Sequence, residues 1–338
     1  MNRFTALTEQ AHEKKNNRTG ILMVNLGTPD EPDTASVRRY LREFLSDPRV
    51  VEIPRLIWLI ILHGIVLRVR PAKSAKLYKS IWTDEGSPLM AIGKRQRDRL
   101  EQALHDSGQQ DFELKLTMRY GKPPVREALR AFQQQGIHRV VVLPLYPQYA
   151  GPTTGSTFDV IADELKQWRW VPELHFINSY HDHPLYIEAL ANTIRKHFEE
   201  QGKPQKLVLS YHGMPKRNLL LGDPYHCQCQ KTTRLVMELL GLGEDEYVTT
   251  FQSRFGKAEW LQPYTDATLK SLPGQGVKDI AIISPAFSAD CLETIEELDR
   301  ENRNIFMDAG GEQYRYIPCL NDNEDHIRLM AELLQPYL

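Results

Sequence analysis

Short apolar runs that stop at glycine or proline recur along the whole chain, and this recurrence limits the fold more than any other feature of the sequence. The first run is Gly20–Leu26, which ends at Gly27-Thr28-Pro29. Between the runs lie stretches with helical periodicity, such as Asp33–Leu45, whose apolar residues fall on one face. Strands that alternate with helices form βαβ units and parallel sheets. The sequence therefore predicts an α/β fold.

The same reading applied to the rest of the chain gives an ordered set of expected elements. The expected strands are Gly20–Leu26, Phe112–Met118, Arg139–Leu145, Leu174–Asn178, Lys206–Ser210, Tyr247–Phe251, Asp279–Ser284 and Tyr314–Pro318. The helices that follow the last four strands are expected at Thr232–Leu240, Thr265–Leu272, Asp290–Arg303 and Glu324–Leu338.

The second half of the chain repeats the plan of the first. Val24–Pro29, VNLGTP, corresponds to Ser210–Pro215, SYHGMP, and each segment follows a buried run. A chain of 338 residues is long enough for two domains with separate cores. We therefore expect two domains of one fold, with a boundary near Pro172–His183.

Composition excludes several functional classes. The formal net charge is −2, so no basic surface favours nucleic acid as the main partner. The sequence contains no phosphate-binding glycine motif that would indicate a nucleotide cofactor. Its polar first residues, 1–19, have no apolar core typical of a signal peptide. Four scattered cysteines fit a reducing cytosol, and Cys227 and Cys229 lack the second close pair that a metal cluster requires.

The most apolar stretch is Leu56–Leu67, LIWLIILHGIVL, between Arg55 and Arg68. It has 12 residues, and a helix needs about 20 to span a bilayer. It is either a buried helix or an exposed flap over an apolar ligand or a membrane surface.

His212 stands where the run Lys206–Ser210 is stopped by Gly213 and Pro215. Ligands of open α/β sheets bind at this carboxyl edge of the strands. A turn histidine with satisfied hydrogen bonds is the plainer alternative. The other strand ends of the chain would display mainly aromatic and apolar groups at one cleft, which suits a large flat apolar ligand with carboxylates.

An acidic row marks the expected helix Asp290–Arg303. Glu293, Glu297 and Glu301 are spaced four residues apart, and like charges at this spacing each cost a few tenths of a kcal/mol. A visiting cation would explain the row, although a solvated helix face and a capping box at Asp290 explain it equally well. Imidazole and carboxylate together suit a divalent first-row metal and can take up protons. That combination would suit the insertion of a metal into a nitrogen macrocycle.

At these residues the sequence resembles the ferrochelatase family, whose members insert ferrous iron into protoporphyrin IX in haem synthesis. The resemblance runs from Gly20 almost to the C-terminus and is closest to the bacterial type. The matching motifs, in order, are Asn25–Pro29, Ser87-Pro88-Leu89, Met118–Gly121, Leu145–Tyr149, Ser210–Pro215 and Phe287–Thr294.

The resemblance implies two Rossmann-like, chelatase-fold domains, each a four-stranded parallel sheet flanked by helices. They would cover residues 1–175, with the apolar run as a lip, and 176–338, with His212 and Glu293 as the catalytic iron site. Asp290, Glu297 and Glu301 would form an acidic path for iron or protons. The porphyrin contacts implied are Leu26, Lys79, Arg119, Tyr120, Tyr149, Pro215 and Trp260.

The resemblance also bears on cofactors, partners and location. Iron would be a substrate rather than a resident cofactor, and no [2Fe-2S] cluster is expected because no cysteine follows Cys319. Two departures from the family pattern are Cys291, where many relatives have histidine, and Lys79-Ser80, where some have arginines for the porphyrin carboxylates. The enzyme is expected in the cytoplasm, where the lip could contact the inner membrane face or another enzyme of the pathway. A coproporphyrin or other tetrapyrrole chelatase and a non-catalytic porphyrin-binding protein are the alternatives.

Overall fold

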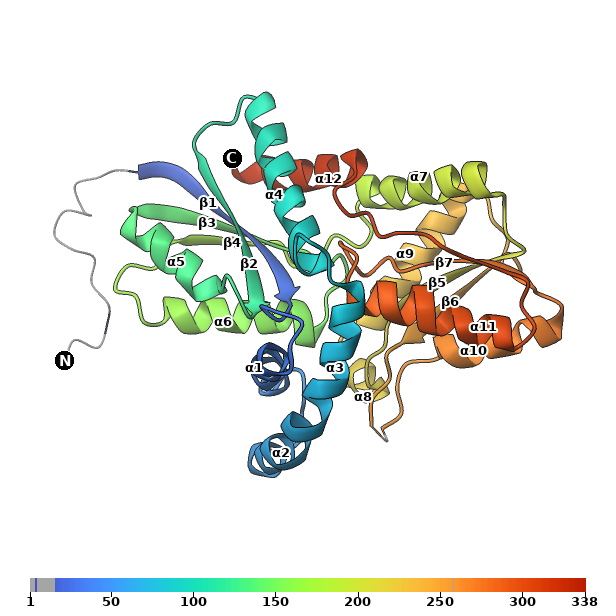
Figure 1. Cartoon of the computed structure of the whole chain (residues 1–338). Coiled ribbons are helices and arrows are strands. Elements are labelled where there is room, and N and C mark those ends of the chain that lie inside the picture. Colours follow the sequence, from blue (N-terminus) through green and yellow to red (C-terminus); the bar gives the residue numbers. More distant parts are fainter. Residues whose placement is uncertain (1–3, 5–15, 257) are drawn as a thin grey trace. The chain divides into compact units, whose positions relative to one another are not determined.

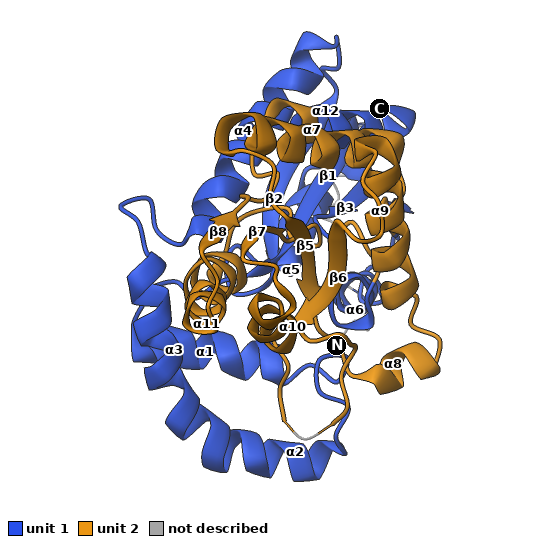
Figure 2. Cartoon of the chain, turned by 90° about the vertical axis from the view of Figure 1, so that its right-hand side faces the viewer, with its two compact units in different colours: residues 1–146, 150–178, 327–338 blue, residues 147–149, 179–326 orange. Residues whose placement is uncertain are grey.

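The computed structural model describes residues 4, 16–256 and 258–338. These form two compact units, which are described separately (Figure 2). Unit 1 comprises the residues up to Tyr146 with Ala150–Asn178 and Ile327–Leu338. Unit 2 comprises Pro147–Tyr149 and Ser179–His326. The domain boundary predicted between residues 175 and 176 stays a prediction, and the prediction about residues 1–19 falls largely outside the described residues.

Unit 1 is built on a four-stranded parallel sheet in the order β2-β1-β3-β4 (Figure 1). Ile21 of the central strand lies between Leu114 and Val141 of its two neighbours. The strands are β1 (Asn16–Gly27), β2 (Phe112–Tyr120), β3 (Ile137–Pro144) and β4 (Glu173–Phe176).

Helices cover both faces of this sheet because β1 is apolar on both sides. Leu22 and Val24 face one core with Leu129 and Ile161 of the helices α5 (Val125–Gln134) and α6 (Ser156–Leu165). The helix α4 (Pro88–Asp106) packs against β1 and β2. The remaining helices at the start of the unit are α1 (Thr34–Leu45), α2 (Arg55–Ile61) and α3 (Leu67–Ile81).

Unit 2 repeats this sheet order as β6-β5-β7-β8, again fully parallel. The identical order agrees with the expectation, drawn from the internal sequence repeat, that both halves share one fold. Its strands are β5 (Lys206–His212), β6 (Tyr247–Gln252), β7 (Asp279–Ile283) and β8 (Gln313–Tyr316). The α/β class with two four-stranded parallel sheets is thus confirmed.

One face of the second sheet carries the unit's main apolar core. Val208 and Ile282 of the sheet pack there with Leu269, Leu298 and Phe306. These come from α10 (Thr265–Ser271), from a wide helix named η5 (Glu293–Asn302), and from α11 (Arg303–Asp308). Helices α7 (Pro184–Gln201) and α9 (Tyr225–Leu240) pack against each other. The short α8 (Lys216–Leu220) follows β5, and α12 (Glu324–Leu334), most of which belongs to unit 1, ends the chain with a final turn at Gln335–Tyr337.

The helix predicted over Asp290–Arg303 is present, but most of it is not α-helical. Glu293–Asn302 is a π-helix, with a wider turn than an α-helix, and α-helical geometry resumes only at Arg303. Side chains from elsewhere donate hydrogen bonds to its carbonyls, including Tyr314 of β8 to Leu298 at 2.5 Å. Donors on distant strands are invisible to helical periodicity, so the sequence pattern reported only that some helix is present.

The apolar run Leu56–Leu67 forms α2 and a π-helical turn, η2 (Leu62–Val66), leading into α3. The buried-helix alternative holds for only one face: Trp58 is buried, and its indole N–H donates to the carbonyl of Leu45 at 2.6 Å. The opposite face exposes Leu56 (80%) and Ile60 (75%). Within unit 1, the segment from α2 to α3 extends away from the sheet, and α2 lies at its far end (Figures 1 and 2). The run is therefore an exposed apolar lip anchored along one side.

Candidate active site

His212 is the last residue of β5, at the carboxyl edge of the unit 2 sheet. Its Nδ1 lies 2.7 Å from the carbonyl oxygen of Gly213. A carbonyl oxygen only accepts hydrogen bonds, so Nδ1 is the donor, and in the neutral imidazole Nε2 keeps its lone pair. The ring of Phe287 flanks the imidazole at a centroid distance of 6.3 Å. The arrangement leaves one imidazole nitrogen able to bind a metal or accept a proton.

The turn after His212 requires glycine. A Cβ on Gly213 would lie 2.4 Å from the carbonyl oxygen of Gln252, to which the Gly213 N–H donates at 2.7 Å. Beyond the turn, Pro215 forms a bridge with Trp260. The Trp260 indole N–H donates to the carbonyl of Phe255 at 2.8 Å, which fixes the indole beside the strand end. Two predicted porphyrin contacts, Pro215 and Trp260, are thus paired with each other near His212.

The wide helix η5 brings acidic residues toward the same strand ends. Glu297 is held by the residue after β6: the Ser253 backbone N–H donates to its Oε1 at 2.8 Å, and the Ser253 hydroxyl donates to Oε2. Ser253 has a φ of 61°, a left-handed conformation that aims both donors at one carboxylate.

Burial raises the pKa of Glu297. The hydrogen bonds from Ser253 and the positive charge of His212 in its protonated form oppose this effect, and the negative charge of Glu293 adds to it. Two predicted site residues, His212 and Glu293, therefore each lie within electrostatic reach of a third, Glu297. The arrangement joins a nitrogen ligand to carboxylates, one of which takes up a proton more readily than an exposed glutamate.

The other two residues of the predicted acidic path differ in setting. Glu301 is exposed. Asp290 is buried, and its carboxylate accepts hydrogen bonds from the Thr294 hydroxyl at 3.0 Å, the Asn321 amide at 2.7 Å and the Tyr316 hydroxyl. Asp290 thus ties the start of the wide helix to the segment after β8, rather than presenting its carboxylate to solvent.

Cys291 lies between Asp290 and the wide helix. Burial, together with the negative charge of Glu293, raises the pKa of its thiol well above the usual value. Cys291 is consequently a neutral thiol at neutral pH. Cys229 and Cys319 are also buried with raised thiol pKa values, and Cys227 is exposed. Among the described residues, no group of three or more His, Cys, Asp or Glu side chains is placed to hold a metal ion.

In unit 1, Arg119 and Tyr120 end β2 in a buried polar network. The Arg119 guanidinium donates to Asp47 at 2.5 Å and to the hydroxyl of Ser156 at 2.6 Å. The hydroxyls of Tyr120 and Ser156 donate to the same Asp47 oxygen at 2.9 and 2.7 Å. Tyr120 is fully buried, so its side chain supports Arg119 rather than forming a surface.

Asp47 balances this network. Burial alone would raise its pKa, but hydrogen bonds from Ser156 and the Arg49 N–H, together with the Arg119 charge, outweigh burial and lower it. Asp47 is therefore ionised at neutral pH and neutralises Arg119.

The remaining predicted porphyrin contacts lie at separate places. Leu26 is half-buried near the end of β1, where Gly27 has a φ of 119° and a Cβ would lie 1.8 Å from the Tyr120 carbonyl oxygen. Lys79 is exposed on α3. Tyr149 belongs to unit 2, and its N–H donates to the Gln228 side chain at 2.7 Å.

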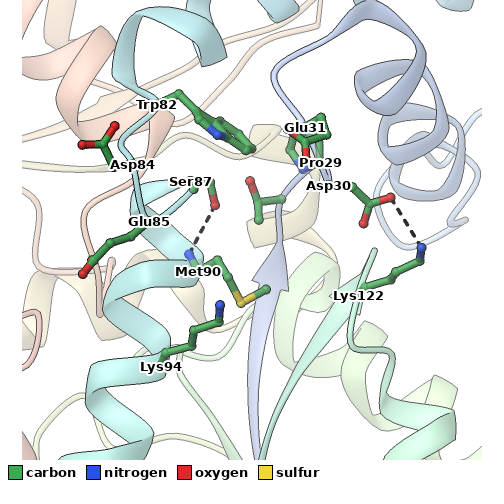
Figure 3. A pocket seen from close by; sticks show the side chains of 12 residues that line it. Pro29, Asp30, Glu31, Trp82, Asp84, Glu85, Ser87, Met90, Lys94 and Lys122 are labelled. Atoms are coloured by element: carbon green, nitrogen blue, oxygen red, sulfur yellow. Dashed lines mark hydrogen bonds and ion pairs between the residues drawn. The ribbon is translucent and has the colours of Figure 1, made fainter.

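A pocket of about 430 Å³ opens beside the end of β1 (Figure 3). The Thr28 hydroxyl in its wall is buried without a hydrogen-bond partner among the described residues. Four carboxylates line the pocket against two lysines, a charge balance that does not favour an anionic ligand. The lining residues are Thr28, Pro29, Asp30, Glu31, Trp82, Asp84, Glu85, Gly86, Ser87, Met90, Lys94 and Lys122.

Comparison with known proteins identifies the family. The model of the family described as Ferrochelatase matches residues 18–338. The chain belongs to the ferrochelatase family. It is 65% identical over 321 residues to "Ferrochelatase 2" of Shewanella oneidensis, covering 95% of this chain and 98% of the relative. It is 61% identical over 334 residues to the "Ferrochelatase" of Shewanella denitrificans, covering 96% and 99%.

Membership of the ferrochelatase family confirms the predicted reaction class. The chain is an enzyme of haem biosynthesis, a lyase that inserts iron into a porphyrin, and iron is its substrate. A solved structure titled "SirB from Bacillus subtilis with Fe3+" shares the fold, with a TM-score of 0.55, 12% identity and 94% coverage of both chains. At that identity the likeness supports the fold alone.

Three residues that hold the candidate site residues of this ferrochelatase-family chain were missed by sequence reasoning. Gln252 ends β6 and Ser253 follows it, so their position beside β5 in a parallel sheet was the available signal. Asp47 follows α1 in a segment with no recognisable pattern, and its partners Arg119 and Ser156 lie 72 and 109 residues away. Nothing in the sequence alone links those three positions.

Proposed function

We propose that the porphyrin substrate is protoporphyrin IX and that His212 and Glu293 form the iron site. The observation that carries this proposal is the hydrogen bond from His212 Nδ1 to the Gly213 carbonyl, which leaves Nε2 free to bind iron or accept a proton. The electrostatic link from His212 to Glu293 through Glu297 supports placing both residues at one site.

The reaction exchanges two pyrrole protons for one ferrous ion. Fe²⁺ binds the four ring nitrogens, and the two N–H protons pass to bases on the protein. Nε2 of His212 is one base, and Glu293 stabilises the metal or relays a proton. Glu297 is suited to receive a proton afterwards because burial raises its pKa. Bending of the ring by remote contacts would turn the pyrrole nitrogens toward the iron.

Porphyrin contacts are proposed for exposed or half-buried residues, most of them near the strand ends and one, Lys79, on α3. In unit 1 these are Leu26, Lys79 and the accessible part of Arg119, which Tyr120 and Asp47 hold in place. In unit 2 the proposed contacts are Tyr149, Pro215 and Trp260. Lys79 is a point charge rather than a planar fork, so it would attract a porphyrin carboxylate without fixing its orientation.

Two further proposals concern iron–sulfur chemistry and location. We propose that the protein holds no [2Fe-2S] cluster. Among the described residues, which include all four cysteines, no three possible ligands are placed to hold a metal, whereas a cluster needs four, which supports this proposal. We also propose a cytoplasmic enzyme whose lip contacts the inner membrane face or another enzyme of the pathway. The exposed side chains of Leu56, Ile60 and Ile65 support such a contact. Among the described residues, no helix is long and apolar enough to cross a membrane.

The test is anaerobic incubation of the purified protein with Fe²⁺ and protoporphyrin IX, with coproporphyrin III in parallel. Haem formation is followed by absorption. We expect insertion into protoporphyrin IX that is lost in His212→Ala. Insertion into coproporphyrin III alone would mean that coproporphyrin III, not protoporphyrin IX, is the substrate. An undiminished rate in His212→Ala would refute the assigned site.

A further inference from the structure

Gln252 occupies a junction between the two elements that carry the proposed iron site. It is the last residue of β6 and lies directly beside His212 in the register of the sheet. Its backbone carbonyl accepts the Gly213 N–H at 2.7 Å, so it also fixes the turn that follows His212.

The side chain of Gln252 is 3% exposed and makes hydrogen bonds in both directions. Its Oε1 accepts from the Ser210 hydroxyl at 2.8 Å. Its Nε2 donates to the backbone carbonyl of Glu293 at 2.9 Å and lies 3.4 Å from a carboxylate oxygen of Glu297. Both acceptors on the helix side lack hydrogens when Glu297 is ionised, so the nitrogen end of the amide must face the helix.

The wide helix η5 depends on donors from the sheet. π-helices are rare and usually limited to a single turn, whereas η5 extends over 10 residues. Gln252 of β6 donates to the carbonyl of Glu293 in the first turn, and Tyr314 of β8 donates to that of Leu298 one turn later. The two side chains thus attach the helix to the sheet at two points, one at Glu293 itself and one at Leu298, five residues further along.

We infer that Gln252 is a positioning residue of the iron site, which sets the first turn of η5 relative to the strand end that presents His212. The inference rests on the proposed roles of His212 and Glu293 and adds a residue that touches neither iron nor porphyrin. One residue connects all three parts: the backbone carbonyl of Gln252 holds the Gly213 turn, and its side-chain amide contacts the Glu293 backbone and the Glu297 carboxylate. A change in the side chain therefore alters how both glutamates are placed relative to the strand end that presents His212.

Side chains that orient metal-binding groups affect metal affinity or activity by about 10- to 100-fold when they are replaced. Gln252→Met keeps the length of the side chain and removes both polar atoms. Gln252→Glu keeps the shape but places a carboxylate, which cannot donate when ionised, against the Glu293 carbonyl. We expect both variants to lose about 10- to 100-fold in kcat/KM for iron.

The decisive measurement separates iron from porphyrin. Initial rates at varied Fe²⁺ and varied protoporphyrin IX give a KM for each substrate, and quenching of protein fluorescence gives porphyrin affinity without turnover. A positioning role predicts changes in kcat and in the KM for Fe²⁺, with porphyrin affinity unchanged. Wild-type kinetics in Gln252→Glu would show that the donor is dispensable and would overturn the inference.

Tyr314→Phe supplies the matched control. It removes one hydroxyl that donates to a carbonyl of the same helix, at Leu298, and leaves Gln252 intact. We expect it to lower thermal stability without an iron-specific kinetic effect. An equal iron-specific loss in Tyr314→Phe would mean that both side chains merely stabilise η5, which would overturn the inference. Absence of iron insertion by the wild-type protein would instead refute the proposed function.

Discussion

Asp47→Asn tests how much the buried polar network around Arg119 contributes to the free energy of unfolding. The Asp47 carboxylate accepts from Arg119, Tyr120 and Ser156, and the side chains of Arg119 and Asp47 are only 14% and 6% exposed. Removing one partner of a buried ion pair costs about 3–5 kcal/mol. Because asparagine keeps the shape and one acceptor oxygen, we expect the lower end, about 3 kcal/mol. That value corresponds to about a 100-fold change in the unfolding equilibrium constant.

The assay is urea unfolding followed by circular dichroism at neutral pH. Asp159→Asn is the control, because it breaks the Arg49–Asp159 pair, whose side chains are 40% and 42% exposed. An exposed pair contributes about 0–1 kcal/mol, so the control should lose far less free energy of unfolding. Equal losses in the two variants would refute the reasoning that burial makes the Asp47 network strong.

The pH dependence provides a second check on the same variant. The pKa of Asp47 is lowered in the folded protein from its ordinary 3.8. A lowered folded pKa contributes stability that is present above the unfolded value and is lost as the pH falls through the folded value. The difference in unfolding free energy between wild type and Asp47→Asn should therefore shrink in acid. A difference that stays constant down to about pH 2 would contradict the assigned charge state.

Two further predictions concern His326 and the lip. Burial lowers the pKa of His326 from 6.5 to about 4, so its contribution to stability is present above 6.5 and is lost as the pH falls toward 4. We expect His326→Asn to reduce the difference in unfolding free energy between pH 7 and pH 4 by about 3 kcal/mol, measured by urea titrations at the two pH values. An unchanged difference would contradict this prediction. For the lip, Leu56→Ser with Ile60→Ser should reduce sedimentation with phosphatidylglycerol–phosphatidylethanolamine vesicles about 10-fold or more, since each buried side chain contributes about 1.5–3 kcal/mol. Leu220→Ser with Leu221→Ser, a second exposed pair, is the control, and an equal loss there would argue against a membrane-specific lip.

The strands were predictable because their signal is local. Each expected strand, such as Lys206–Ser210, is present within a few residues, and His212 stands at the strand end where glycine and proline placed it. The same locality explains the helix caps at Asp33 and Ser87, whose side chains accept from nearby backbone N–H groups. Residues that a strand displays can thus be found from the sequence.

The supports of the displayed residues could not be found in this way. Arg119 was predicted, but its partner Asp47 lies 72 residues away. Glu293 and Glu297 were predicted, but the width of their helix depends on Gln252 and Tyr314 in strands outside it. Hydrophobic periodicity contains no information about such pairs. Each residue fits the pattern of its own helix or strand whether or not its distant partner is present.

The lip shows why composition alone also falls short. Leu56–Leu67 is apolar on every side, so its sequence cannot say which face is covered. In the structure, Trp58 and Leu62 are buried, whereas Leu56 and Ile60 are largely exposed to solvent. Covering two such side chains would contribute about 3–6 kcal/mol, a large amount beside the stability of a typical domain. An exposed face of this kind is therefore retained at a thermodynamic cost, which a membrane surface or an apolar ligand would offset during function.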